Sequence, residues 1–208
     1  VAAYEFSRGN FDMDSIKARF QTIVGMDFAE VMTLEQPDRM KCSPNYFALY
    51  DGGRLNPTKY LLFQDVFRGI FDSTVYDEGD HFKNASKALE KASKNAEWGY
   101  MFKPIKALAD VMDVKYNLGI KTREIYKTRD KEKLKALAET EYSELIKRLE
   151  SFYNEYEAVW LREKKAESFD VQDIRLGGLI QRIKHCQKRL LAYASGEESE
   201  LSELETEL

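Results

Sequence analysis

The chain has 208 residues, of which 43% are hydrophobic and 33% charged, and its formal net charge is -4. This length suits one large domain or a domain with a smaller lead-in, and the composition is that of a soluble globular protein with a charge-rich surface. The acidic balance argues against a nucleic-acid partner. No apolar run approaches the roughly 18 residues of a membrane span, and we expect no signal peptide.

Residues 1–75 are predicted to begin with two short helices. Asp12 or Asp14 can cap the first helix and Gly25 can end it, while Asp27 can cap the second. These are local signals, because a short acidic side chain can accept a hydrogen bond from a free amide of the first turn.

An irregular segment follows, from about residue 36 to residue 75. It holds three of the four prolines, and Asn56-Pro57-Thr58 looks like a cap followed by proline at the first helical position. The stretch from Tyr60 to Phe71 is rich in apolar residues without a clear period. We expect residues 56–71 to lie against the surface of another domain.

Residues 76–196 show helical periodicity, with apolar residues spaced three and four apart. Pro104 falls early in one helix, where its missing donor costs little. Short loops near 128–130 and 166–170 make consecutive helices antiparallel neighbours, and residues 197–208, with six glutamates, are expected to be a frayed acidic tail. The predicted helices run from Phe82 to Ala96, Trp98 to Tyr126, Leu134 to Trp160 and Val171 to Ala194, the last ending at Gly196. The predicted fold class is all-α: an antiparallel bundle of three to four long helices with short N-terminal helices and an irregular loop region.

Two adjacent glycines, Gly177 and Gly178, interrupt the last predicted helix. Each costs about 1 kcal/mol relative to alanine in a helix interior. The sequence therefore predicts that another backbone packs closely there, with Asp173 and Arg175 anchoring the start of the helix, and that Gly178→Leu would loosen or unfold the bundle.

No motif in the chain predicts catalysis or metal binding. His81 and His185 lie far apart, without ligands at metal-binding spacing, so no metal site is expected. Cys186 lies on an apolar helix stripe, where a thiol is usually inert. Asp77-Glu78 is interpreted as the polar loop and cap region before a helix rather than as a glycosidase carboxylate pair.

Two groups of polar residues among aromatic residues leave two interpretations open. Asp65 lies near Tyr60 in the irregular segment, accompanied by Gln64 and Arg68, and Trp98 opens the longest predicted helix. Such groups can form a sugar-binding rim, or they can be the polar anchors of a core or an interface. The residue types alone favour the second interpretation without excluding the first.

Four ordered segments resemble a known family. They are Asn56-Pro-Thr-Lys-Tyr-Leu-Leu-Phe-Gln-Asp65, Gly69-Ile-Phe-Asp72, Asn95-Ala-Glu-Trp-Gly-Tyr100 and Phe169-Asp-Val-Gln-Asp-Ile-Arg-Leu-Gly-Gly178. Together they are similar to the C-terminal α-helical domain that follows the catalytic barrel in a subgroup of bacterial β-N-acetylhexosaminidases of glycoside hydrolase family 20. The resemblance extends from about Phe11 to Ala194.

The resemblance implies a parent enzyme that removes terminal β-linked N-acetylglucosamine or N-acetylgalactosamine. In that family an Asp-Glu pair on the barrel acts with the substrate's own acetamido group, and neither the pair's context nor the barrel occurs here. We therefore assign no catalytic residue, expect no cofactor, and expect this chain alone to be inactive. Its partners would be the barrel of the same parent chain, a second copy in a homodimer, and N-acetylhexosaminide glycans through the parent enzyme.

Two further expectations follow from this reading. Tyr60, Asp65 and Trp98 would either lend groups to the rim of the parent's active site or stabilise the interface with the barrel. The alternative from another class is a non-enzymatic helical scaffold or adaptor that shares only the helical periodicity.

The two cysteines, Cys42 and Cys186, are too few for a disulfide framework. They indicate a reducing compartment, so we expect a cytoplasmic protein, and a single bridge between them remains an alternative. The chain begins at Val1 without a methionine, and we expect it to be part of a longer protein whose preceding domain is missing.

Overall fold

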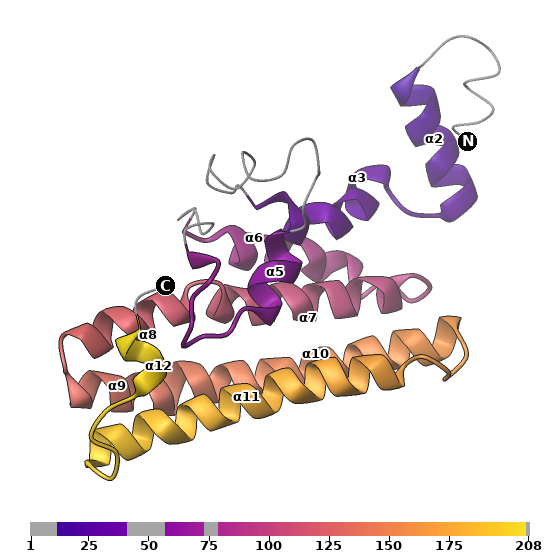
Figure 1. The fold of residues 1–208 in the computed structure, drawn as a ribbon. Helices are drawn as coiled ribbons and strands as arrows, with labels where there is room; N and C mark the ends of the chain where they lie inside the picture. The colour runs from indigo at the N-terminus through magenta and orange to yellow at the C-terminus, as the bar shows by residue number, and fades with distance from the viewer. Residues whose placement is uncertain (1–11, 41–56, 73–78, 207–208) are drawn as a thin grey trace.

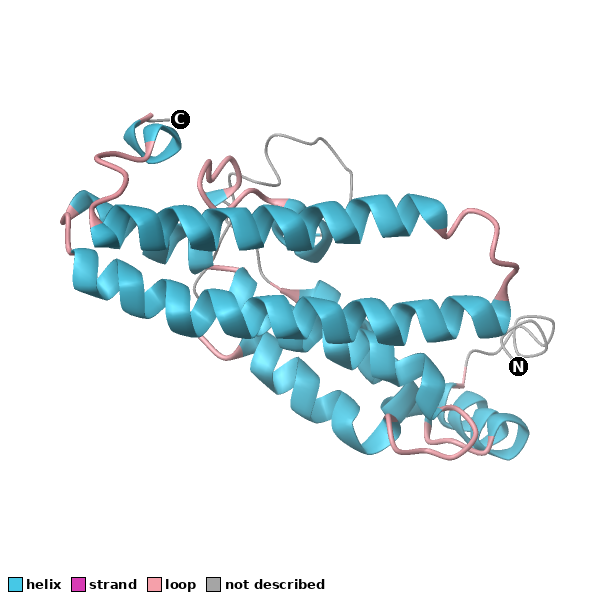
Figure 2. Cartoon of the chain, turned by 90° about the horizontal axis from the view of Figure 1, so that it is seen from below, coloured by secondary structure: helices cyan, strands magenta, loops and turns pink. Residues whose placement is uncertain are grey.

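The structure, a computed structural model, describes residues 12–40, 57–72 and 79–206. Every regular element in these ranges is a helix (Figure 2). The predicted all-α fold class is therefore confirmed. None of the described helices is both long enough and apolar enough to cross a membrane.

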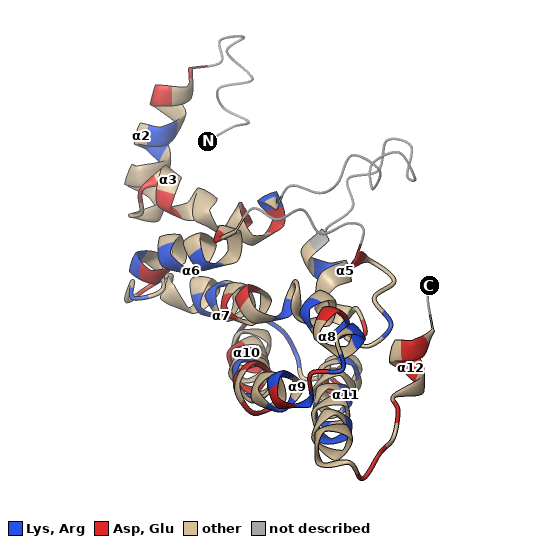
Figure 3. Cartoon of the chain, turned by 90° about the vertical axis from the view of Figure 1, so that its left-hand side faces the viewer, with Lys and Arg blue, Asp and Glu red and all other residues tan. Residues whose placement is uncertain are grey.

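Three long helices form the centre of the fold. α10 (Ser143–Glu163) packs along α7 (Gly99–Lys115), and α11 (Asp170–Ser195) runs antiparallel beside α10 (Figure 1). α6 (His81–Ala92) covers another side of α7. α10 and α11 lie nearly along one direction, so that Figure 3 shows both end on. The short connection between α10 and α11 makes these two helices antiparallel neighbours.

The short N-terminal helices are confirmed. α2 (Met13–Val24) is capped by the Asp12 carboxylate, which accepts a hydrogen bond from the Asp14 amide, and it ends at Gly25 with a φ of 75°. α3 (Phe28–Val31) is capped by Asp27, whose carboxylate accepts from the Ala29 amide at 2.6 Å. A 3₁₀ helix, Met32–Arg39, and α5 (Pro57–Phe63) complete this part of the chain.

The prediction of one continuous helix from Trp98 to Tyr126 is wrong, because the structure has two helices in this range. α7 ends at Lys115, and α8 (Leu118–Lys127) begins after a short turn. The turn brings Gly119 against the loop after α5, where a Cβ at Gly119 would lie 2.8 Å from the carbonyl oxygen of Val66. The spacing of apolar residues depends on local sequence and does not indicate such a long-range contact. The helical pattern therefore continues across the turn between α7 and α8, although the helix does not. The first predicted helix is also shorter than expected, since α6 ends at Ala92.

The third predicted helix is continuous in space, although its hydrogen bonding changes. α9 (Lys131–Leu137) runs through a π-helical turn, Ala138–Tyr142, into α10. The Tyr142 ring is fully buried and its hydroxyl lies 2.9 Å from the Thr122 hydroxyl. The fourth helix, α11, ends at Gly196 as predicted, with a φ of 89°.

The acidic tail differs from the frayed segment that the sequence predicts. Leu201 and Leu204 are buried, and residues Ser202–Glu205 form α12 beside α8 (Figure 1). The Leu201 amide donates to the hydroxyl of Tyr126 at 3.0 Å. Two leucines three residues apart give the tail an apolar side. Arg129 forms an ion pair with Glu205, and Arg189 forms ion pairs with Glu198 and Glu203. The expected boundaries near residues 75 and 196 stay predictions.

The core consists of two apolar clusters. The larger lies between α7, α8, α10 and α11 and extends to α5 and the tail, and the smaller joins α6, α7 and the N-terminal helices. The fully buried large side chains of the larger cluster include Phe67, Tyr126, Tyr142, Leu145, Leu149, Ile183 and Leu190. Within segment 56–71, Leu61, Leu62, Val66 and Phe67 are buried inside this chain, and Phe63 and Ile70 are exposed. The docking of this segment on another domain stays a prediction.

Candidate functional site

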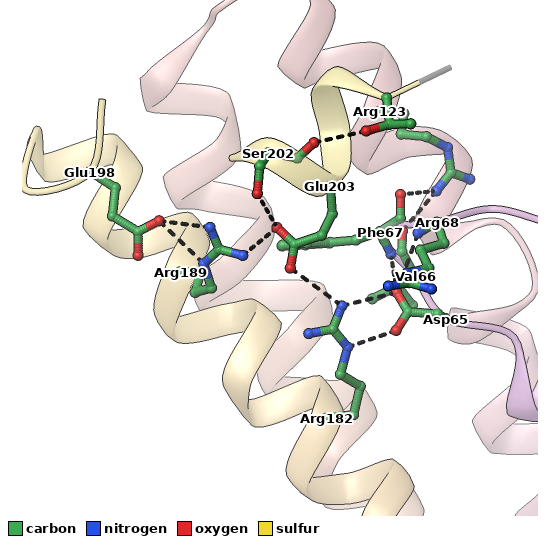
Figure 4. Close-up of polar contacts among 11 residues, drawn as sticks. Asp65, Val66, Phe67, Arg68, Arg123, Arg182, Arg189, Glu198, Ser202 and Glu203 are labelled. Carbon is green, nitrogen blue, oxygen red and sulfur yellow. Dashed lines mark hydrogen bonds and ion pairs between the residues drawn. The ribbon is translucent and has the colours of Figure 1, made fainter. Parts of the chain in front are cut away.

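Asp65 lies at the centre of a network of charged groups between the loop after α5, α11 and the tail (Figure 4). Its carboxylate accepts hydrogen bonds from the amides of Phe67 at 2.8 Å and Arg68 at 3.2 Å. It also accepts from the Nε of Arg182 at 2.6 Å. Burial acts to raise the pKa of Asp65, but the Arg182 hydrogen bond and the two amides outweigh it, so that this pKa lies below its usual value.

The network continues into the tail through a second arginine. Arg189 binds Glu198 at 3.0 Å and also forms an ion pair with Glu203. Burial acts to raise the pKa of Glu203, yet the hydrogen bond from Arg189 outweighs burial and the pKa is lowered. Asp65 and Glu203 line one cleft together with Arg182. Because the pKa values of both carboxylates are lowered, they are ionised acceptors rather than proton donors.

A second set of contacts ties the same loop to α8. Gln64 donates to Asp72 at 2.7 Å and accepts from the Phe71 amide at 3.1 Å. Arg123 donates to the carbonyl oxygen of Val66 at 2.9 Å and forms an ion pair with Asp72. These contacts stabilise an irregular backbone whose carbonyls have no helical partner, which favours the anchoring interpretation of Gln64 and Asp65.

Lys115, which sequence reasoning missed, is buried beneath this loop. Its Nζ donates to the carbonyl oxygens of Leu61 at 2.9 Å and Gln64 at 2.7 Å. The lysine therefore satisfies carbonyls at the C-terminal end of α5. Burial lowers its pKa to about 7. A usable signal was present, because Lys115 falls four residues after Val111, on a buried stripe of α7.

The buried lysine predicts a pH dependence of stability. The folded chain binds fewer protons than the unfolded chain between the lowered pKa of about 7 and the ordinary value of 10.5. The free energy of unfolding should therefore rise with pH above 7, by at most about 1.4 kcal/mol per unit. Urea titrations should be compared below pH 9, because the pKa of the buried Cys186 thiol, raised from 9.0 to about 12 by burial, acts in the opposite sense above it. Lys115→Met should flatten the rise, whereas parallel pH profiles would contradict this assignment.

Trp98 lies in a different place, in a groove between the N-terminal half of α7 and the C-terminal half of α10. The groove has a volume of about 680 Å³. Its lining is mainly aromatic and aliphatic, and consists of Trp98, Tyr100, Met101, Pro104, Ile105, Leu108, Phe152, Tyr156, Val159, Trp160, Glu163 and Lys164. Both indole nitrogens are engaged within the chain, Trp98 with the Val24 carbonyl at 2.9 Å and Trp160 with the Lys165 carbonyl at 3.0 Å.

Charged side chains border this groove. The Arg162 guanidinium lies 3.5 Å from the centre of the Tyr100 ring, and the Lys164 ammonium lies 4.2 Å from the centre of the Trp160 ring. A hydrogen bond with Glu163 raises the pKa of Tyr100. The groove thus has an apolar floor and a charged rim, which is the usual anatomy of an interface between protein surfaces.

The three candidate rim residues do not form one site. Asp65 lies near the C-terminal end of α7, where Lys115 holds the carbonyl of Gln64, and Tyr60 packs its ring 5.4 Å from that of Phe71. Trp98 immediately precedes the N-terminal end of the same helix, which has 17 residues. At 1.5 Å per residue, about 25 Å separates the two ends.

The glycine pair is not closely packed within the described chain, which corrects the prediction. Gly177 and Gly178 are both exposed, and no described atom would lie within 4 Å of a Cβ at either position. Asp173 accepts a hydrogen bond from the Tyr153 hydroxyl at 2.6 Å, and Arg175 is exposed. The prediction failed because glycine in a helix does not reveal which molecule approaches it.

The remaining candidates are the histidines, the cysteines and the Asp77-Glu78 pair. Within the described ranges, no group of three or more His, Cys, Asp or Glu side chains is placed to hold a metal ion. His185 is exposed while Cys186 is buried. Asp77-Glu78 and Cys42 lie outside the described residues.

Comparison with known proteins places this geometry in a family. The model of a family described as the Glycoside Hydrolase 20C C-terminal domain matches residues 30–208, which include both the charged network and the aromatic groove. No curated protein matches the chain.

Proposed function

The chain belongs to the family of glycoside hydrolase 20C C-terminal domains, and on this basis we propose that it is a non-catalytic helical domain that supports the catalytic barrel of its parent enzyme. The parent would be a bacterial enzyme of carbohydrate metabolism that removes terminal β-linked N-acetylhexosamine. Membership of this family favours that role over the scaffold or adaptor alternative. We also propose a cytoplasmic location, which the unpaired, buried Cys186 supports.

The state of the carboxylates in the charged cleft carries the non-catalytic part of the proposal. A glycosidase acid must hold a proton near neutral pH, which requires a raised pKa. Asp65 and Glu203 instead have lowered pKa values, because arginines bind them. The described cleft that contains them therefore supports a structural role.

The aromatic groove supports docking on a catalytic domain. Aromatic and methionine side chains are enriched at the buried centres of interfaces, and charged residues at their rims. The groove has this composition, and 40% of Met101 is exposed at its surface. We propose that the catalytic barrel covers the groove in the parent enzyme, while the glycans contact the barrel.

Calorimetric titration of this chain with the separately expressed catalytic domain tests the docking. Met101→Lys places a charge in the apolar floor and should weaken binding by about tenfold or more, equivalent to at least 1.4 kcal/mol. Ile70→Lys is a matched control, since Ile70 is 63% exposed and lies outside the groove. Absence of binding, or weakening by Ile70→Lys alone, would contradict docking through the groove.

A further inference from the structure

A basic pocket adjoins the aromatic groove at the start of α7. It has a volume of about 510 Å³, and its lining includes Lys94, Lys103, Arg162, Tyr100 and the turn at residues 93–96. The groove and the pocket share Tyr100, and the Arg162 guanidinium lies over the ring of that residue. This end of the molecule, where α7 begins and α10 ends, lies at the right in Figure 1. The groove and the pocket therefore form one continuous surface.

The positive charge of this pocket is only partly neutralised within the described chain. No carboxylate lines the pocket. Lys94 pairs with Glu90 at 2.6 Å, yet 72% of its side chain is exposed, and Arg162 contacts Glu163 at 3.6 Å. Lys103 is exposed and forms no ion pair with another described residue. The pocket thus presents ammonium groups to a carboxylate that approaches from another molecule or domain.

The polar groups of the groove favour an apolar occupant over a sugar. The indole nitrogens of Trp98 and Trp160 donate to backbone carbonyls of this chain, and the Tyr100 hydroxyl is hydrogen-bonded to Glu163. Cations also lie over the rings of Tyr100 and Trp160, where a sugar ring would stack. The lining therefore offers mainly apolar contacts rather than the convergent free donors and acceptors that orient a polar ligand.

The shape of the groove suits a helix. It lies between α7 and α10, and on α7 its lining extends from Trp98 to Leu108. These are about ten residues, or about 15 Å at 1.5 Å per residue. An amphipathic helix binds such a groove with apolar side chains spaced three and four residues apart. A helix of about three turns covers this length.

We propose that the occupant of the groove is an amphipathic helix of the parent's catalytic domain, with carboxylates at the end that lies on the basic pocket. This inference rests on the proposed docking of the catalytic domain and adds the chemistry of the docking segment. The apolar face of the helix packs on the groove, and its carboxylates pair with Lys103 and Lys94. These pairs fix the position of the helix along the groove, because complementary charges set the register of an interface and like charges disfavour the others.

Zero-length cross-linking of the intact parent enzyme with a carbodiimide identifies the occupant. The reagent activates a carboxylate, and a lysine amine in contact with it then forms an amide. We expect mass spectrometry to find Lys103 joined to an aspartate or glutamate of the catalytic domain. Lys121 and Glu141, whose Nζ and carboxylate oxygen lie 2.9 Å apart, are the internal positive control. Lys103→Arg keeps the charge and should remove the Lys103 cross-link alone.

Two results of this experiment would overturn the inference. One is a cross-link between Lys121 and Glu141 without any cross-link from Lys103 to the catalytic domain. The other is a Lys103 cross-link found only to carboxylates of residues 1–208, which would assign the pocket to this chain itself.

Charge reversal separates this inference from the docking on which it rests. In calorimetric titration with the catalytic domain, Lys103→Glu should weaken binding roughly fivefold at low ionic strength and less at high salt, because ions screen exposed charges. Lys147→Glu, at an exposed position of α10 outside the groove and the pocket, is the matched control and should bind like the wild type. Binding that Met101→Lys weakens and Lys103→Glu leaves unchanged would overturn the acidic helix and keep the docking. Absence of binding would contradict the docking and the inference together.

Discussion

Gly99→Ala is expected to lower the free energy of unfolding by about 2–3 kcal/mol, in the range of overpacking a rigid site. A Cβ at this position would lie 2.5 Å from the backbone oxygen of Ser93, which cannot move away as a flexible side chain can. The clash would push the turn after α6 away from the start of α7. Chemical denaturation with circular dichroism measures the loss.

Gly177→Ala is the matched control for this prediction. Its Cβ would meet no described atom within 4 Å, and the residue has a helical backbone in the interior of α11. Alanine should therefore stabilise the chain by about 0.5–1 kcal/mol. Equal destabilisation by both substitutions would show that the close approach at Gly99 has been misjudged.

Asp65→Ala is expected to destabilise the fold by about 2 kcal/mol. The substitution leaves the partly buried Arg182 guanidinium without its 2.6 Å partner and removes the acceptor for two backbone amides. Because the folded-state pKa of Asp65 is lowered, its contribution is present above the ordinary value of 3.8 and is lost as the pH falls through the folded value. Asp65→Asn, which keeps an acceptor oxygen, should be intermediate.

The same variant decides between the two interpretations of Asp65. In the parent enzyme, the anchoring interpretation predicts lower thermal stability with unchanged KM and kcat at temperatures where the protein is folded. A raised KM with unchanged melting temperature would instead place Asp65 at the substrate rim. Trp98 would need a separate test, because it lies at the other end of α7.

The parts of the fold that the sequence predicted depend on local signals. Asp12 and Asp27 cap helices because a carboxylate reaches amides two residues away, and Gly25 and Gly196 end helices because they adopt positive φ. Apolar spacing likewise identified α6, α10 and α11. Each of these caps, helix ends and apolar patterns depends on only a few neighbouring residues.

The features that escaped prediction depend on contacts between distant residues. The division between α7 and α8 follows from Gly119 meeting Val66, and the ordered tail follows from Leu201 meeting Tyr126. Trp98 was identified as a candidate, but its partners on α10 were not, because only the fold brings Tyr156 and Trp160 to it. Lys115 falls on the buried stripe of α7, but its hydrogen-bond partners, the carbonyls of Leu61 and Gln64, could be identified only from the fold.

Hydrolysis of a nitrophenyl N-acetyl-β-glucosaminide by three preparations tests the central claim most directly: this chain alone, the catalytic domain of its parent alone, and the two mixed. We predict no release of nitrophenol by the chain, activity from the catalytic domain that decays rapidly on warming, and slower decay in the mixture. Nitrophenol release by the purified chain would contradict a non-catalytic role, and decay unchanged by adding the chain would contradict a supporting one.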